Sequence, residues 1–385
     1  MNLTDKWNES GKTIDGFRNV CRNIAEATKM IKCKGYKMTM LINCLIPKLQ
    51  FPDKTTVYVV NQEDIENLSE TNRIEHCGTL PYSVYSKELC DEMKSGTKML
   101  ACVDDNTYFI STKAIASLGR WIGYTGADIN RNGMSFIDAL CFARKVFMKE
   151  DYLKLVYRED DNKKKIFGAF GTKYVIIPMT YLSDLFDNIK GLEMVKWEST
   201  HETTEFIADV GDGKARPAIR VVGSNIGVCS WTFQAVLRHG SDYVVIDEET
   251  CENSKKLTYI NMELAARKMI KVAKETAKAI ESIATPIMDY TAKNDFFEEN
   301  FKRIDFLTGT IIDSLPVGKK WKTSLKATME DDIDCSRQYT YKDLFIFAMR
   351  IPEKIEEANP YTIECVRKAL STSAIFLAEE SKKIA

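Results

Sequence analysis

The feature that most constrains this fold is a succession of short apolar segments between Tyr152 and Gly240, each bounded by turn-forming residues. One helical segment, from Thr180 to Lys190, interrupts the succession. Because most of these segments follow one another directly, they favour an antiparallel sheet over a doubly wound parallel one. The first three, YLKLVYR, KIFGAFG and KYVIIP, predict a hairpin extended by a third strand; LEMVKW, TEFIADV, AIRVVG, WTFQAVL and YVVI predict a second block of strands.

The flanking regions have a different pattern. The N-terminal hundred residues predict a helix from Gly11 to Lys32, a strand from Thr55 to Val60 and a short helix that starts at Asn61. The segments MLACV and TYFI predict two further strands, and helical spacing follows them in two stretches, Thr112 to Ile122 and Met134 to Met148. Beyond Leu257 the chain is helical, with stops at Leu315-Pro316-Val317-Gly318 and Ile351-Pro352.

These patterns predict an α+β fold: a mixed, largely antiparallel sheet with flanking helices, followed by an all-helical C-terminal region. We expect three parts: an N-terminal mixed region (1–97), an α+β core (98–250) and a helical region (251–385).

Charge and cysteine content limit the classes of partner. The 54 basic and 55 acidic residues nearly cancel, so any contact with a polyanion must come from a local patch, and the low net charge favours a homo-oligomer. None of the 11 cysteines is spaced as C-x-x-C, which argues against a local zinc site and for reduced thiols. With no leader and no long apolar run, we expect a cytoplasmic protein that has no membrane contact, metal or cofactor.

The order of the motifs carries a family resemblance. TYFISTKAIASLGRWIG is followed by YLKLVYRED, FGAFGTKYVIIPMTYLSDLFDNI, RPAIRVVGSNIGVCSWTFQAVLRHG and a long helical tail. This order resembles the phage/plasmid-like proteins, a family of mobile elements catalogued as a domain of unknown function. Lys173-Tyr174, with the helix after Pro178, and Ser224-Asn225-Ile226-Gly227 match its two blocks, whereas Arg238-His239-Gly240 departs from it. The resemblance covers about Asp104 to Phe347 and implies a mobile-element protein; it implies no particular reaction.

Two glycine-rich segments, GSNIG and GAFGTK, superficially resemble phosphate loops. Neither has the G-x-x-x-x-G-K-[ST] spacing, and the second runs into a predicted strand instead of a helix. We therefore predict a structural turn in which Ser224 and Asn225 satisfy local backbone donors. Gly227 would supply a positive φ or a close backbone approach.

The candidate acid, base and metal-binding residues are scattered. His76, His201 and His239 are far apart in sequence and outside any H-E-x-x-H spacing. The acidic run Glu330, Asp331, Asp332 and Asp334 has enough oxygens for a divalent cation, but a solvated loop explains it more simply. The sequence therefore predicts no catalytic residue and no metal ligand.

Three cationic groups are candidates for contact with nucleic acid. In the first, Arg267, Lys271, Lys274 and Lys278 recur every three or four residues on one face of a helix, opposite an apolar side made of Met262, Ala265, Met269, Val272 and Ile280. Four aligned cations can follow successive phosphates, although a solvated helix face gives the same pattern.

The other two groups are shorter. Lys163, Lys164 and Lys165 lie at the tip of the predicted hairpin, where they either contact phosphate or solubilise a turn. In Lys319, Lys320, Trp321 and Lys322 an aromatic ring stands between cations, a combination that can stack a base beside its phosphate. A core tryptophan flanked by snorkelling lysines explains it equally well.

Two hypotheses follow. The first is a mobile-element protein that binds or anneals single-stranded DNA, in recombination for example, without bond chemistry. The second is a phage-encoded module that binds or inhibits a host defence or replication protein. An enzyme ranks third, because the chain has no nucleophile elbow, Walker lysine or dinucleotide fingerprint.

Overall fold

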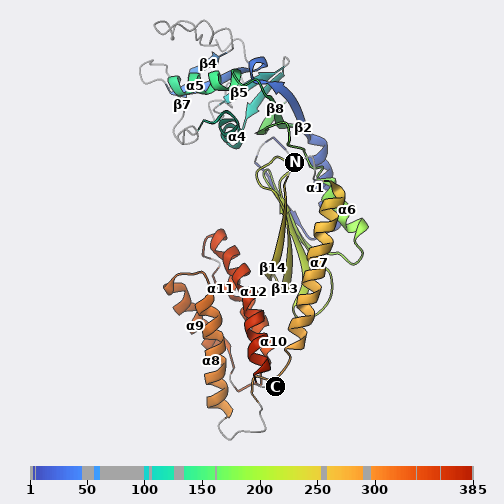
Figure 1. The fold of residues 1–385 in the computed structure, drawn as a ribbon, viewed down its shortest axis with the longest axis vertical. Helices are drawn as coiled ribbons and strands as arrows, with labels where there is room; N and C mark the ends of the chain where they lie inside the picture. Colours follow the sequence, from blue (N-terminus) through green and yellow to red (C-terminus); the bar gives the residue numbers. More distant parts are fainter. Residues whose placement is uncertain are drawn as a thin grey trace.

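The computed structural model describes residues 3–4, 6–45, 56–60, 99–103, 106–124, 134–160, 163–252, 258–288, 296–334, 336–355 and 357–383. These residues form two β-sheets and a helical region that follow one another along the long axis of the molecule (Figure 1). Sheet B lies at one end, sheet A in the middle and the helical region at the other end. The predicted α+β class is confirmed.

Sheet A is fully antiparallel and contains the second predicted block of strands. Its order is β1 (Asn8–Gly11), β10 (Glu193–Thr200), β11 (Thr204–Asp209), β12 (Arg216–Gly223), β13 (Trp231–His239) and β14 (Asp242–Cys251). All five predicted strands of this block are present, and nearly all side chains of β11, β12 and β13 are buried or half-buried.

One face of sheet A packs against three helices, α1 (Ile14–Ala27), α6 (Thr180–Asn188) and α7 (Tyr259–Ser282). Side chains from both layers form the core between them, including Phe17, Leu182, Phe206, Trp231 and Met269. Burial of these large apolar groups is the main stabilising contribution on this side of the sheet.

Sheet B is mixed. Its order is β2 (Thr28–Lys34), β8 (Tyr152–Asp160), β9 (Lys163–Phe170), β6 (Asn106–Ile110), β5 (Met99–Val103), β3 (Thr39–Leu45) and β4 (Thr56–Val60), and β7 (Met134–Ser135) pairs with β3. Two pairings, β6 with β9 and β3 with β7, are parallel. Helices α4 (Thr112–Ile122) and α5 (Phe136–Phe147) pack against one face. Because β3 pairs with β5, this sheet extends across the predicted boundary at residue 97.

Two local predictions are wrong. The first helix ends at Ala27 instead of Lys32, and the chain continues as β2 and then the 3-10 helix η1 (Gly35–Lys37). The segment KYVIIP is not a strand: the ring of Tyr174 stacks on Phe170 at 3.8 Å, and β8 and β6 are the neighbours of β9. The short helix predicted from Asn61 lies outside the described residues.

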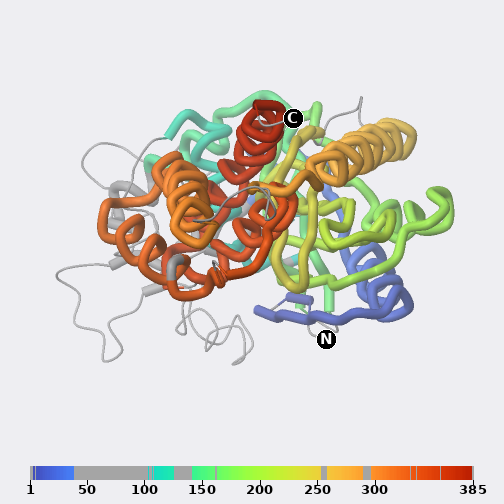
Figure 2. Tube along the Cα trace, turned by 90° about the horizontal axis from the view of Figure 1, so that it is seen from below, coloured from blue at the N-terminus to red at the C-terminus, as the bar shows by residue number. Residues whose placement is uncertain are grey.

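The helical region contains α8 (Phe296–Ser314), α9 (Lys319–Asp332), α10 (Tyr341–Ala348), α11 (Ile351–Lys354) and α12 (Pro360–Lys382). Leu315-Pro316 ends α8 as predicted, whereas Ile351-Pro352 begins α11, because proline fits the first turn of a helix. Figures 1 and 2 both show α12 between α8 and α7. No helix in the described parts of the chain is long and apolar enough to span a bilayer.

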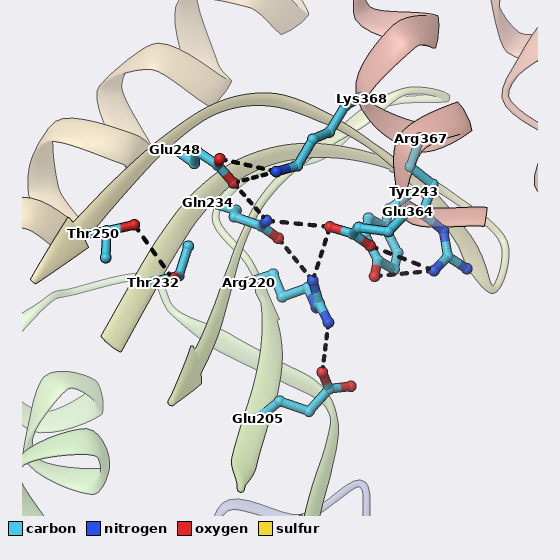
Figure 3. Close-up of polar contacts among 10 residues, drawn as sticks. All are labelled: Glu205, Arg220, Thr232, Gln234, Tyr243, Glu248, Thr250, Glu364, Arg367 and Lys368. Atoms are coloured by element: carbon cyan, nitrogen blue, oxygen red, sulfur yellow. Dashed lines mark hydrogen bonds and ion pairs between the residues drawn. The ribbon is translucent and has the colours of Figure 1, made fainter. Parts of the chain in front are cut away.

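The N-terminal half of α12 lies against the second face of sheet A through polar side chains (Figure 3). Arg220 on β12 donates to Glu205 at 2.7 Å, to Gln234 at 2.9 Å and to Glu364 of α12 at 3.3 Å. Lys368 of α12 donates to Glu248 of β14 at 2.9 Å. Thus α12 contacts this face through complementary charges.

Candidate nucleic-acid interface

Helix α7 holds the predicted cationic stripe in place. It begins with a capping box, in which Thr258 and Asn261 satisfy each other's backbone N–H groups. Met262, Ala265, Met269 and Ile280 of its predicted apolar side are buried, and Val272 packs against the same core. The opposite side therefore faces solvent, where Arg267, Lys271, Lys274 and Lys278 are all exposed.

All four predicted cations line a single groove of about 660 Å³ beside α7. The other wall is the end of α6 and the residues that follow it, Asn188, Ile189 and Lys190. Five of the described lining side chains are cationic, counting Lys190, whereas Glu275 is the acidic one among them. The groove is therefore positively charged.

The cations differ in how far they are neutralised. Arg267 pairs with Glu263 at 2.6 Å and donates to the carbonyl oxygen of Asn188 at 2.9 Å, which ties α7 to the end of α6. Lys271 lies 3.8 Å from Glu275, and both side chains are largely exposed, so this pair is weak. Lys274 and Lys278 make no hydrogen bond or ion pair with any residue that the structure describes.

A second hollow of about 440 Å³ shares Lys274 and Lys278 and continues toward the turn between β11 and β12. Its lining adds two carboxylates, Asp212 and Glu281. The groove is thus cationic along most of α7 and mixed in charge at its far end. The residues from Lys190 to Lys278 form the cationic part of the groove.

The lysines of β9 lie elsewhere, in sheet B. All three are half-buried, and Lys164 donates to Asn106 at 2.7 Å and lies 3.8 Å from Glu159. The ammonium of Lys163 stands 5.3 Å from the centre of the Phe109 ring. Lys163, Lys164 and Lys165 are therefore strand residues with neighbours of their own and do not extend the α7 groove.

The third cationic group lies in the helical region, at the start of α9. Trp321 packs against the helical core, and Lys322 donates to the carbonyl oxygen of Asp313 at 2.6 Å. Lys319 and Lys320 remain exposed. The structure thus distributes the eleven predicted residues over three separate places, and the stripe on α7 forms the groove.

The Ser-Asn-Ile-Gly turn is held by local hydrogen bonds. Ser224 Oγ accepts from the N–H groups of Ile226 and Val228, both at 3.3 Å. Gly227 has a φ of +76°, and a Cβ there would lie 2.2 Å from the Phe170 ring, so it satisfies both predicted reasons for glycine.

Asn225 has a wider role than the predicted local one. Its side-chain oxygen accepts from Arg158 at 3.0 Å, its side-chain nitrogen donates to Thr28 at 3.1 Å, and its carbonyl oxygen accepts from Tyr174 at 2.9 Å. These contacts join Tyr174, which follows β9, to the Ser224–Gly227 turn. They also connect sheet A to sheet B.

Arg158 is the buried centre of that connection. Besides Asn225, its guanidinium donates to the carbonyl oxygen of His201 at 2.9 Å, and none of its described partners is a carboxylate. Burial lowers the pKa of this guanidinium to about 10. Oxygen dipoles, supported by the ring of Phe167 at 5.1 Å, solvate the charge, so the arrangement is structural.

The remaining candidates do not converge. His201 lies 3.3 Å from Glu202, His239 contacts the carbonyl oxygen of Lys214 at 3.0 Å, and His76 is outside the described residues. Burial lowers the pKa of His201, and the nearby carboxylate of Glu202 opposes that shift. Asp332 pairs with Lys354, and Asp334 accepts from Ser336. Within the described ranges, no cluster of histidine, cysteine and carboxylate side chains is arranged to hold a metal ion.

Comparison with known proteins adds no family. No protein-family model matches the chain, and neither a curated protein nor a solved structure matches it.

Proposed function

We propose that this chain binds single-stranded nucleic acid, single-stranded DNA in the first instance, by seating the phosphate backbone in the α7 groove. The observation that carries the proposal is the alignment of Lys271, Lys274 and Lys278 along one groove, with the last two free of described carboxylate partners. Such a site acts by neutralising charge and needs no bond chemistry. Binding or annealing in the cytoplasm of a bacterial host, on behalf of a mobile element and as a homo-oligomer, fits both this chemistry and the family resemblance.

The dimensions support an extended ligand. With a rise of about 1.5 Å per residue, the stripe from Arg267 to Lys278 is about 16 Å long, enough for several successive phosphates. The described walls of the groove carry no aromatic side chain, and Ile189 and Ile270 supply its apolar lining. The groove therefore recognises the backbone of a strand and carries no base preference of its own.

The test measures the affinity for a labelled oligothymidylate by fluorescence anisotropy across a salt series. We expect log K to fall with log salt concentration by about 0.7 for each phosphate contact, so the three lysines contribute a slope of about −2. Lys271→Glu/Lys274→Glu should weaken binding more than tenfold and flatten the slope. The matched control is Lys319→Glu/Lys320→Glu on α9, which changes the charge equally and should bind like the wild type. Unchanged binding by the α7 variant would remove the proposed site.

An exposed aromatic surface supports a second candidate function, binding of a host protein. Phe297 and Phe301 lie one turn apart on α8, and both are exposed. Aromatic residues are typical of protein interfaces. This function predicts salt-insensitive co-purification with a host protein that is lost in Phe297→Ser/Phe301→Ser and retained in the α7 variant.

A further inference from the structure

A second open cationic surface lies on strands β2 and β8 of sheet B. Residues alternate between the two faces of a strand. On β2 and β8, Ile31, Cys33, Leu153 and Leu155 pack into the core under α4 and α5. Their neighbours lie on the opposite face, which we call the β2–β8 face: Met30, Lys32, Lys34, Tyr152 and Lys154, with Tyr36 of η1 beside them.

Two tyrosines and two lysines form the centre of this face. Lys34 is directly opposite Tyr152 in the antiparallel register. The ammonium of Lys34 lies 5.2 Å from the centre of the Tyr152 ring and 5.6 Å from that of Tyr36, so the two rings flank one cation. Lys32 lies 4.2 Å from the centre of the Tyr152 ring. Cations and aromatic rings therefore alternate over a small area.

The rings are accessible. Tyr152 and Tyr36 are 43% and 44% exposed, and Met30 beside them is 40% exposed. Single exposed apolar side chains are common on protein surfaces, whereas several exposed together are informative. The other described ring–lysine pairs near sheet B have buried or packed rings. Lys163 and Lys164 lie beside the buried rings of Phe109 and Tyr108, and the rings of Trp121 and Tyr124 pack against the α4–α5 core.

The face has unneutralised positive charge. Neither Lys32 nor Lys34 makes an ion pair or hydrogen bond with a described residue, and Lys154 donates to the carbonyl oxygen of Tyr174 at 2.6 Å. The nearest acidic residues in sequence, Glu150 and Asp151, are exposed and precede β8. Glu159 pairs with Lys29 at 2.7 Å, and Lys29 alternates to the other side of β2.

Protection of a sheet edge accounts for part of this pattern. β2 is the terminal strand of sheet B, and lysines on an edge strand discourage pairing with another chain. That role needs lysines alone, whereas this face also holds two tyrosine rings open to solvent. Exposed aromatic rings beside free cations are the combination that binds unpaired bases together with their phosphates.

We propose that the β2–β8 face binds a single-stranded nucleic acid by stacking bases on Tyr152 and Tyr36, while Lys32 and Lys34 bind the adjacent phosphates. The ligand class rests on the proposed function, but the surface is separate from the α7 groove. A lysine above an exposed ring is held weakly, so a base can displace it and leave its ammonium free for a phosphate. The groove would then hold the backbone and this face would hold the bases.

The test compares two ligands with equal phosphate numbers, an oligothymidylate of about 16 nucleotides and an abasic oligomer of the same length. We expect the wild type to bind the oligothymidylate at least tenfold more tightly, because stacking on one aromatic ring contributes about that factor per base. Tyr36→Ala/Tyr152→Ala should abolish this preference, and Tyr36→Phe/Tyr152→Phe should keep it. The same difference with oligouridylate supports the proposal and extends the ligand to RNA.

Controls separate this proposal from the previous one. Tyr361→Ala removes an exposed ring of α12 and should leave the preference unchanged. Lys271→Glu/Lys274→Glu should weaken the binding of both ligands by the same factor and keep the preference. If this variant binds both ligands as tightly as the wild type does, the groove proposal is refuted and the proposal for the β2–β8 face is unaffected. The proposal for the β2–β8 face is overturned if the wild type shows no preference, or if the alanine variant retains it with an unchanged unfolding temperature.

Discussion

The second faces of the two sheets differ in what covers them. In sheet A, the row Glu205, Arg220, Gln234 and Glu248 crosses four strands, and α12 lies over it with Glu364 and Lys368 opposite groups of complementary charge or polarity (Figure 3). In sheet B, the row on β2 and β8 carries lysines and tyrosines, and no helix supplies carboxylates to it within the described residues. The polar face of sheet A is covered by its own chain. On sheet B the β2–β8 face is open around Tyr152, whereas Val156 and Arg158, farther along the same side of β8, are buried.

This difference shows that a polar sheet face can be covered by a helix when its charged groups have partners of opposite charge. Arg220 keeps its charge in the closed face: burial opposes the charged form, but Tyr243, Glu205 and Glu364 outweigh it and raise its pKa. Gln234 beside it is only 3% exposed and is fully hydrogen-bonded to its neighbours. Lys32 and Lys34 of the β2–β8 face have no carboxylate partner among the residues that the structure describes.

The largest expected effect on stability comes from removing the central charge of the face that α12 covers. Arg220→Met should destabilise the protein by about 3 kcal/mol, because it leaves Glu205 and Glu364 beside a largely buried apolar side chain. Urea unfolding monitored by circular dichroism measures the change. Lys32→Met on the open face is the comparison and should change the free energy of unfolding by less than about 1 kcal/mol. Equal effects of the two substitutions would contradict the distinction.

The second largest effect on stability should come from low pH, which protonates a carboxylate on the face of sheet A that α12 covers. The hydrogen bond from Lys368, against the opposing effect of burial, holds the pKa of Glu248 below its usual value. A carboxylate with a lowered pKa stabilises the fold above its unfolded pKa and loses that contribution as the pH falls through the folded value. Glu248→Gln should therefore show a smaller loss of stability below about pH 4.5 than the wild type, by up to about 1 kcal/mol. Identical pH profiles would show that the Lys368 pair contributes nothing.

The smallest effect on stability should come from neutralising the open face. Lys32→Gln/Lys34→Gln should change the free energy of unfolding by about 1 kcal/mol or less, because exposed cation–π contacts are weak. The same variant should reduce the magnitude of the salt slope for oligothymidylate by about 1.4, that is about 0.7 for each phosphate contact. A strongly destabilised variant would mean that these lysines are structural.

The sequence predicted those elements whose local pattern agrees with their final environment. Strands β10 to β14 are short apolar segments bounded by turn residues, and α7 separates apolar from cationic faces. Both could therefore be recognised, and the four α7 cations do share one groove. The groove itself could not be predicted, since Asn188 and Lys190 reach it from α6, about eighty residues earlier in the chain.

The β2–β8 face was missed for a local reason. Val20, Ile24, Thr28 and Ile31 continue a helical spacing of three and four residues, so the helical pattern extends into a segment that pairs with β8 as a strand. Tertiary pairing overrides that spacing from Thr28 onward. The alternation of Met30, Lys32 and Lys34 with Ile31 and Cys33 was the pattern in the sequence that could have indicated a strand here. The segment KYVIIP was wrongly predicted to be a strand because it is rich in β-branched residues. In the structure it is irregular, and Tyr174 holds it through a ring contact with Phe170 and a hydrogen bond to Asn225.

The most direct test of the account is the salt dependence of oligothymidylate binding by the wild-type protein. Lys32, Lys34, Lys271, Lys274 and Lys278 together predict that log K falls with log salt concentration with a slope of about −3.5. A slope near that value, reduced by substitutions at either surface, would support two open cationic sites on one chain. Absence of binding at low salt, or binding that salt does not weaken, would contradict the account.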